Sequence, residues 1–225
     1  MILQIPKLII IDLDGTLIDT VPDLAEAVDG MMTQLNLPKR GEAKTRRWVG
    51  NGIDRLVKRA LLDQLEGEPE PKLFQSALAS FKQLYAISNG RHSALYPGIQ
   101  EGLDWLKSQD YKLVCITNKA EQFTLPLLKS LNIHHYFQKV YSGDTLAKKK
   151  PDPLPLLHAA QSFAIEPPQA LMVGDSKNDV IAARAAGLPV LCVSYGYNHG
   201  EDIHLAKPDA VIDSLAELSS ILNDE

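Results

Sequence analysis

The sequence predicts an α/β protein in which helices cover both faces of a parallel sheet and an all-helical domain is inserted after the first strand. Two observations support this. Short apolar runs alternate with segments of helical spacing along most of the chain, whereas residues 19–90 show helical patterns only. Strands that alternate with helices pair in parallel and are buried on both faces. We therefore assign residues 1–18 and 91–225 to an α/β core domain and residues 19–90 to a helical cap domain.

The strands of the core are marked by six apolar runs, each ending in a polar or Gly-containing turn. The first includes residues 8–11, which are all apolar, as expected of a central strand. The runs are 7–13, 112–117, 139–143, 170–174, 190–194 and 210–212. Helical spacing between them predicts helices at 100–108, 122–131, 153–163 and 179–186. This order predicts a Rossmann-like sheet.

The inserted domain is predicted from three helical patterns, at 23–35, 51–65 and 72–85. Residues 66–71 contain two prolines and a glycine, which is typical of a loop. The core is expected to resume near Tyr96-Pro97-Gly98.

Composition limits the function classes. Of 225 residues, 45% are hydrophobic and 23% charged, as in ordinary globular proteins. The net charge of -5 argues against nucleic-acid binding, which needs a basic surface, but not against a small phosphorylated metabolite. The N-terminal stretch lacks the pattern of a signal peptide or a membrane span, so we expect a cytoplasmic protein without membrane contact, either monomer or homodimer. Cys115 and Cys192 lie in apolar runs, which predicts buried free thiols rather than a disulfide or a zinc site.

A pair of carboxylates, Asp12 and Asp14, closes the first strand. Alternation along the strand end points both the same way, and such a pair needs a cation or a shared proton. Gly15 permits a sharp turn and close approach of a ligand. An EF-hand calcium loop does not fit, because the glycine comes too early and a buried strand precedes it. An acidic loop without function is the remaining alternative.

Three further strand ends or loops carry groups suited to phosphate chemistry. Asp175 follows the strand at 170–174, where it could share a metal with Asp12. Asp179 lies four residues later, where helix capping and orientation of metal-bound water are equally good explanations. Thr117-Asn118 ends another strand in a potential anion site, and Lys150 is held by the prolines that follow it. Their shared position predicts one phosphate site.

These segments, DLDGT, TN, KPDP and GDSKND, together resemble the haloacid dehalogenase superfamily of phosphohydrolases across almost the whole chain. The resemblance implies that Asp12 is the nucleophile and Asp14 the general acid and base, that Thr117 and Lys150 hold the phosphoryl group, and that Thr16 and Asn118 contact substrate. It further implies that Asp12, the Asp14 carbonyl and Asp175 bind Mg²⁺, and that Asp179 lies next to these ligands without binding the ion itself. The inserted helices correspond to that family's cap.

Asp14 separates the branches of this superfamily. Its dehalogenases lack this second aspartate, because their leaving group needs no proton, whereas phosphoryl transfer to or from an alcohol needs one. The sequence therefore favours a phosphatase. A sugar-phosphate phosphatase, a phosphomutase with the same core and a non-catalytic phosphate-binding protein are the alternatives.

A closer resemblance, to bacterial phosphoglycolate phosphatases, comes from RWVGNG at 47–52, LVKRAL at 56–61 and YGYNHGE at 195–201. It implies that 2-phosphoglycolate is the substrate. It also implies that Gly50, Asn51 and Gly52, together with Arg55 or Arg47, receive its carboxylate when the cap closes. A flexible helix start with Trp48 in the core is the structural alternative for the first segment. For 195–201, a Gly-rich surface turn and a specificity loop both remain open.

Overall fold

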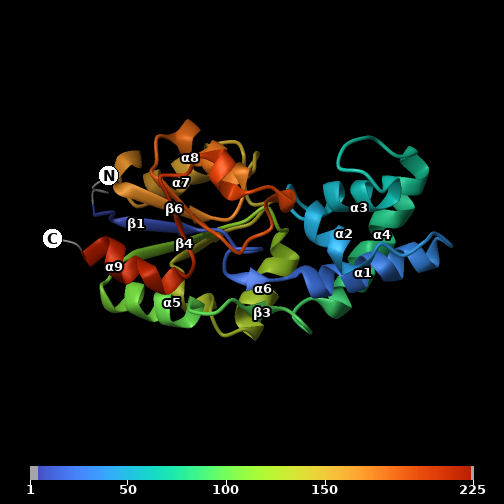
Figure 1. Ribbon diagram of the computed structural model, residues 1–225, viewed down its shortest axis with the longest axis horizontal. Helices are drawn as coiled ribbons and strands as arrows, with labels where there is room; N and C mark the ends of the chain where they lie inside the picture. Colours follow the sequence, from blue (N-terminus) through green and yellow to red (C-terminus); the bar gives the residue numbers. More distant parts are fainter. Residues whose placement is uncertain (1–4, 224–225) are drawn as a thin grey trace.

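The computed structural model describes residues 5–223, and a six-stranded parallel sheet of order β5-β4-β1-β6-β7-β8 forms the centre of its larger part (Figure 1). The strands are β1 (Leu8–Ile11), β4 (Lys112–Ile116), β5 (Lys139–Tyr141), β6 (Ala170–Gly174), β7 (Val190–Val193) and β8 (Ala210–Ile212). Each lies within a predicted run, so the predicted sheet is confirmed. Residues 1–4 and 224–225, which the domain prediction assigned to the core, lie outside the described residues.

Helices cover both faces of this sheet, as predicted (Figure 1). Alternation along β1 sends Ile9 and Ile11 to one face and Leu8 and Ile10 to the other. The first face packs against α5 (Ile99–Ser108), α6 (Glu121–Ser130) and α9 (Leu218–Asn223), and the second against α7 (Leu154–Ser162) and α8 (Lys177–Ala186). The helix α9 was not predicted, because six residues are too few to show a period. Cys115 and Cys192 are buried and free, as expected.

Four helices follow the first strand (Figure 1) and pack around a second apolar core, to which Phe123 and Tyr197 of the larger part also contribute. The four helices are α1 (Val21–Gln34), α2 (Gly41–Trp48), α3 (Ile53–Leu62) and α4 (Pro71–Ser88). Three were predicted, and α2 was missed because it buries only Thr45 and Trp48, which leaves no clear apolar period. Residues 21–88 are thus helical and inserted, whereas their exact division from the core remains a prediction.

Two short strands connect these helices to the sheet. The strand β2 (Ile18–Asp19) pairs antiparallel with β3 (Ala94–Leu95). Asp23 stabilises this connection, because its carboxylate accepts hydrogen bonds from the backbone N–H groups of Gly90 and His92, both at 2.8 Å, and from Ser93. We predicted no strand within residues 19–90. That was wrong for Asp19, since a two-residue strand with a distant partner leaves no local pattern.

The strand order places the functional edge of the sheet. From β1 the chain runs outward through β4 and β5, then crosses back to β6 on the other side of β1 and continues outward. Ligands of open α/β sheets bind at the carboxyl ends of the strands where the order reverses. The ends of β1, β4 and β6 are therefore the expected site. Within residues 5–223, none of the helices combines the length and apolar character needed to cross a membrane.

Candidate active site

A pocket lies where the carboxyl edge of the sheet faces the inserted helices. The core contributes Asp12, Asp14, Thr117, Asn118, Lys119, Lys150, Asp175, Ser176, Asn178, Asp179, Tyr197 and Asn198. The inserted segment contributes Leu24, Val49, Gly50, Gly52, Ile53 and Leu56. Most predicted site residues therefore converge on one cavity; among those predicted, Thr16, Asn51 and Arg55 do not line it.

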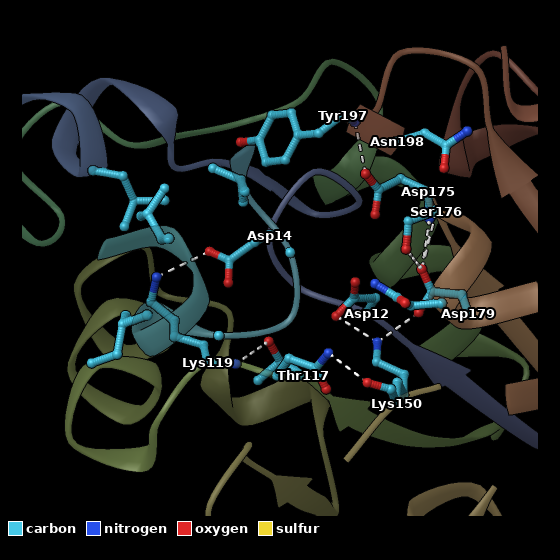
Figure 2. A pocket seen from close by; sticks show the side chains of 18 residues that line it. Asp12, Asp14, Thr117, Lys119, Lys150, Asp175, Ser176, Asp179, Tyr197 and Asn198 are labelled. Carbon is cyan, nitrogen blue, oxygen red and sulfur yellow. Dashed lines mark hydrogen bonds and ion pairs between the residues drawn. The ribbon is translucent and has the colours of Figure 1, made fainter. Parts of the chain in front are cut away.

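Three buried carboxylates meet in this pocket (Figure 2). Asp12 follows β1, Asp175 follows β6 and Asp179 lies in the first turn of α8. One carboxylate oxygen of each lies within 4.8 Å of the others. The ammonium of Lys150 lies 2.8 Å from Asp12 Oδ1 and 2.7 Å from Asp179 Oδ1. The cluster therefore holds three acidic groups and one cation in a volume shielded from water.

Burial governs the ionisation of this cluster. It raises the pKa of Asp12 to about 7, with Lys150 opposing the shift. Burial, and then repulsion from Asp179 and Asp12, also raises the pKa of Asp175 well above its ordinary value. A divalent cation would favour the charged forms, and carboxylate oxygens are the ligands that Mg²⁺ prefers. These residues therefore fit such an ion.

Two glycines make the position of Asp175 possible. A Cβ on Gly15, whose φ is +89°, would lie 2.4 Å from Asp175 Oδ2, and one on Gly196 would lie 2.1 Å from the Asp175 Cβ. The same carboxylate accepts hydrogen bonds from Thr16 Oγ1 at 3.3 Å and from the Tyr197 N–H at 2.7 Å. Thr16 thus holds Asp175 and faces away from the pocket lining.

The strand end after β4 positions Thr117, Asn118 and Lys150 together. The Thr117 N–H donates to Tyr141 O at 3.0 Å, which continues the pairing with β5. Asn118 Nδ2 donates to Lys150 O at 2.9 Å, so the asparagine fixes the backbone of the lysine. The buried Asn118 Oδ1 has no hydrogen-bond partner among the described residues.

Sequence reasoning missed Lys119, the next residue of this turn. Its ammonium is buried and donates to Asp14 Oδ1 at 3.0 Å (Figure 2). It also donates to the hydroxyl of Tyr85, which comes from α4. Burial alone lowers the pKa of Lys119, but Asp14 and Tyr85 raise it above its ordinary range. A lysine directly after Thr-Asn at a strand end was the available signal.

Asp179 has two roles in the structure. One is helix capping, which the sequence had left as one of two alternatives, and the other is an ion pair with Lys150, which was not predicted. Its Oδ2 accepts from the Ser176 N–H at 3.1 Å and from the Ser176 hydroxyl at 2.7 Å, which forms a capping box at the start of α8. Its Oδ1 binds Lys150. Helix capping is thus confirmed, and the ion pair with Lys150 is an addition that depends on the tertiary structure.

The loop between α2 and α3 is the predicted Gly50-Asn51-Gly52 segment. All three residues have positive φ values, so the backbone turns in a way that glycine permits and asparagine tolerates. Asn51 Nδ2 donates to Asn178 Oδ1 on α8 at 3.3 Å, which links the loop to the core. Arg59 of α3 is buried and donates to Trp48 O at 2.7 Å and to Asn51 Oδ1 at 3.2 Å.

The structure does not bring Arg55 or Arg47 to the pocket. Arg55 forms ion pairs with Glu66 and with Glu68, the latter at 3.2 Å, and is not among the residues that line the pocket. The side chain of Arg47 is exposed beside Gly200. Neither arginine lines the pocket in this arrangement, and the expectation that one of them receives the substrate carboxylate when the cap closes stays a prediction.

The segment 195–201 is more than a surface turn. Tyr197 and Asn198 line the pocket, and the buried Tyr197 hydroxyl accepts from the Thr20 N–H at 2.8 Å and donates to Asp19 at 2.8 Å. His199 Nδ1 lies 3.0 Å from Arg47 O, which is a contact with α2. The segment thus connects Asp175 of the carboxylate cluster to Thr20 and to α2 of the inserted helices.

Comparison with known proteins gives relatives over nearly the full chain. A phosphoglycolate phosphatase of Nitrosococcus oceani is 58% identical over 221 residues, 98% of either chain. One of Thiobacillus denitrificans is 50% identical over 211 residues, covering 94% of this chain and 93% of the relative. The crystal structure of a predicted phosphoglycolate phosphatase from Haemophilus somnus has a TM-score of 0.91 at 37% identity, covering 97% of this chain and 98% of that one.

The family model for haloacid dehalogenase-like hydrolases matches residues 9–193, a range that contains Asp12, Asp14, Thr117, Lys150 and Asp175. These are the residues that carried the resemblance seen in the sequence, and the structure gathers them in one pocket. With the model matching most of its length, this chain belongs to the haloacid dehalogenase-like hydrolases.

Proposed function

We propose that this protein hydrolyses 2-phosphoglycolate to glycolate and phosphate in a Mg²⁺-dependent reaction through a phosphorylated Asp12. The observation that carries the proposal is the buried cluster of Asp12, Asp175 and Asp179 around Lys150, with Asp14 two residues after Asp12. The relatives named phosphoglycolate phosphatase support the choice of substrate.

Asp12, the Asp14 carbonyl and Asp175 would hold the Mg²⁺ ion. When bound, the ion offsets the repulsion between the Asp12 carboxylate and the phosphate dianion. The raised pKa values of Asp12 and Asp175 fit this role, because buried carboxylates ionise less easily when no metal cation is present to offset their negative charge.

In the first step, an Asp12 oxygen forms a bond to phosphorus while the ester P–O bond breaks. Lys150, the Thr117 hydroxyl and nearby backbone N–H groups stabilise the charge on the equatorial oxygens. The Thr117 oxygen already accepts the Lys119 N–H at 3.1 Å, which leaves its hydroxyl hydrogen to donate. Asp14 gives its proton to the departing glycolate oxygen.

In the second step, Asp14 takes a proton from a water molecule, whose oxygen attacks the phosphorus of the aspartyl phosphate. The bond from phosphorus to Asp12 breaks, and phosphate and the free carboxylate result. Asp14 is positioned for both transfers by hydrogen bonds from Thr20 Oγ1 at 2.7 Å and Lys119 Nζ at 3.0 Å. Both donors come from segments at the junction of the core and the inserted helices.

We propose that residues 19–90 act as a cap that closes over the substrate. The pocket is lined from both sides, so substrate entry needs movement about the β2 and β3 connection. Closure excludes bulk water from the phosphoenzyme and brings the Gly50-Asn51-Gly52 loop toward the part of the substrate that is not phosphate.

A substrate panel tests this function. Phosphate release from 2-phosphoglycolate, glucose 1-phosphate, glucose 6-phosphate and ethyl phosphate is measured with Mg²⁺, after chelation, and after Mg²⁺ is restored. We expect the highest kcat/KM for 2-phosphoglycolate, by about tenfold or more, and reversible loss on chelation. Higher efficiency on a sugar phosphate, conversion of glucose 1-phosphate to its isomer, or metal-independent release would contradict the proposal.

A further inference from the structure

We infer that Lys119 is the residue that binds the carboxylate of the substrate and so determines its specificity, an inference that rests on the proposed phosphatase function. The pocket lining contains two lysines, Lys119 and Lys150, and, within residues 5–223, no arginine. The two ammonium groups lie on opposite sides of the aspartates, Lys150 against Asp12 and Lys119 against Asp14 (Figure 2). They are therefore available to different parts of one substrate.

The ammonium of Lys150 is committed to the phosphate end. It binds Asp12 and Asp179 at 2.8 and 2.7 Å, and the reaction takes place at Asp12. The ammonium of Lys119 has different partners: among residues 5–223 it donates hydrogen bonds to Asp14 Oδ1 and to the Tyr85 hydroxyl. Since an ammonium has three N–H donors, one remains for a ligand.

The position of Lys119 matches the shape of 2-phosphoglycolate. Asp14 protonates the oxygen that leaves phosphorus, and Lys119 Nζ lies 3.0 Å from Asp14 Oδ1. In the substrate, one methylene carbon separates that leaving oxygen from the carboxylate. A cation one hydrogen bond away from Asp14 is thus within reach of the carboxylate when phosphorus is at Asp12.

The alternative cations are occupied or outside the pocket. Arg55 is paired with Glu66 and Glu68, and Arg59 donates to the backbone carbonyls of Trp48 and Leu65. Lys149 comes close to the loop, since its Nζ lies 2.8 Å from the position of a Cβ on Gly52, but its side chain is exposed. An exposed lysine is screened by water and binds a carboxylate weakly.

Lys119 is also held rigidly for this task. Its side chain is 2% exposed, and its ammonium lies 4.8 Å from the centre of the Tyr85 ring, over which it packs. Tyr85 belongs to α4, so the inserted helices themselves fix the ammonium in the closed arrangement. A buried cation that needs no rearrangement discriminates strongly between a charged and an uncharged substrate group.

The test compares the Mg²⁺-loaded wild type, Lys119→Met and Lys149→Met on two substrates, 2-phosphoglycolate and ethyl phosphate, which lacks the carboxylate. For Lys119→Met, we expect kcat/KM on 2-phosphoglycolate to fall by about 30-fold or more, with a much smaller fall on ethyl phosphate. The loss of preference should appear mainly in KM. Lys149→Met, the matched exposed control, should keep the wild-type preference.

The outcomes separate the two proposals. If the wild type prefers 2-phosphoglycolate and Lys119→Met loses equal factors on both substrates, Lys119 acts only through Asp14 or the fold, and the inference is overturned. If the wild type releases no phosphate in a Mg²⁺-dependent way, the proposed function itself fails. Should Lys119→Met not fold, Lys119→Gln and Lys119→Arg decide: the preference should be lost with Gln and kept with Arg, and any other pattern overturns the inference.

Discussion

Asp12, Asp175 and Asp179 illustrate, at the scale of single residues, how a catalytic site costs stability. Three carboxylates are buried around one lysine, and burial is the main reason that the pKa of Asp12 rises to about 7. Such clusters are stable when a cation joins them and strained electrostatically when it is absent. Removing the charge of Asp12, the proposed nucleophile, should therefore stabilise the metal-free protein.

We predict that Asp12→Asn abolishes turnover and raises the thermal stability of the metal-free protein. The folded pKa of Asp12 lies above the ordinary 3.8, so between about pH 4 and pH 7 the folded state retains a proton that the unfolded state has released. The stability of the wild type therefore falls across this window as pH rises. The gain from the substitution should be near zero at pH 4 and reach on the order of 2–4 kcal/mol above pH 7.

Calorimetry of both proteins in chelator at several pH values measures this, and a gain in Tm of roughly 5–10 °C is expected at pH 8. With saturating Mg²⁺, the advantage should shrink, because the ion stabilises only the wild-type site strongly. A metal-free variant that melts at or below the wild-type temperature at pH 8 would refute the account of the cluster, and residual Mg²⁺-dependent activity would remove Asp12 as nucleophile.

At the scale of elements, α3 carries two arginines one turn apart with different surroundings. Arg55 lies in exposed ion pairs with the loop 66–68, and Arg59 is 5% exposed and donates to Trp48 O, Leu65 O and Asn51 Oδ1. The first kind of contact is screened by water, whereas the second satisfies buried carbonyl groups. Neither arginine lines the pocket, but Arg59 holds the loop that does.

We predict that Arg59→Met lowers the free energy of unfolding by about 2–4 kcal/mol, because buried acceptors lose their donor. It should also raise KM for 2-phosphoglycolate, since the Gly50-Asn51-Gly52 loop loses its support. Arg55→Met, the matched control on the same helix, should change stability by less than about 1 kcal/mol and leave KM nearly unchanged. Denaturant unfolding and steady-state kinetics test both. A large KM effect confined to Arg55→Met would reverse the assignment.

At the scale of the whole molecule, the inserted helices lie beside the part built on the six-stranded sheet (Figure 1). Residues of both parts line the pocket. The connection consists of β2 and β3, with Asp23 bonded to residues 90–93. Contacts between the two sides include Lys119 with Tyr85, Asn51 with Asn178, and His199 with Arg47 O. Phe123 and Tyr197 also pack into the apolar core of the inserted helices, so the proposed opening would break these polar contacts and expose part of that apolar surface.

Hydrogen exchange should reveal this opening. Trifluoroberyllate is an inert mimic of the phosphoryl group. With Mg²⁺ and trifluoroberyllate, we expect the exchange rates of amides in the loops 50–52 and 195–201 to fall by about tenfold or more. Amides of α5 and α9, neither of which lines the pocket, serve as the internal control and should not change. Equal protection throughout the chain would indicate general stabilisation, and no protection at the loops would contradict cap closure.

The local sequence determined the six strands and the residues that end them, because an apolar run followed by a polar turn is a pattern within ten residues or so. Asp12, Thr117 and Asp175 were found for that reason, whereas Lys150 was found because prolines follow it. Parallel strands bring their carboxyl ends to one edge of the sheet. The capping box of Asp179 was likewise a local signal.

Only the tertiary structure decided the ion pairs of Arg55, the partners of Lys119 and the pairing of β2 with β3. Each depends on a partner distant in sequence: Lys119 binds Asp14, 105 residues away, and Tyr85, 34 residues away. Arg55 and Arg59 have the same chemistry and the same helix, and what separates them is which neighbours each side chain reaches after folding. A side chain's charge is written in the sequence, but the group that it neutralises is set by packing.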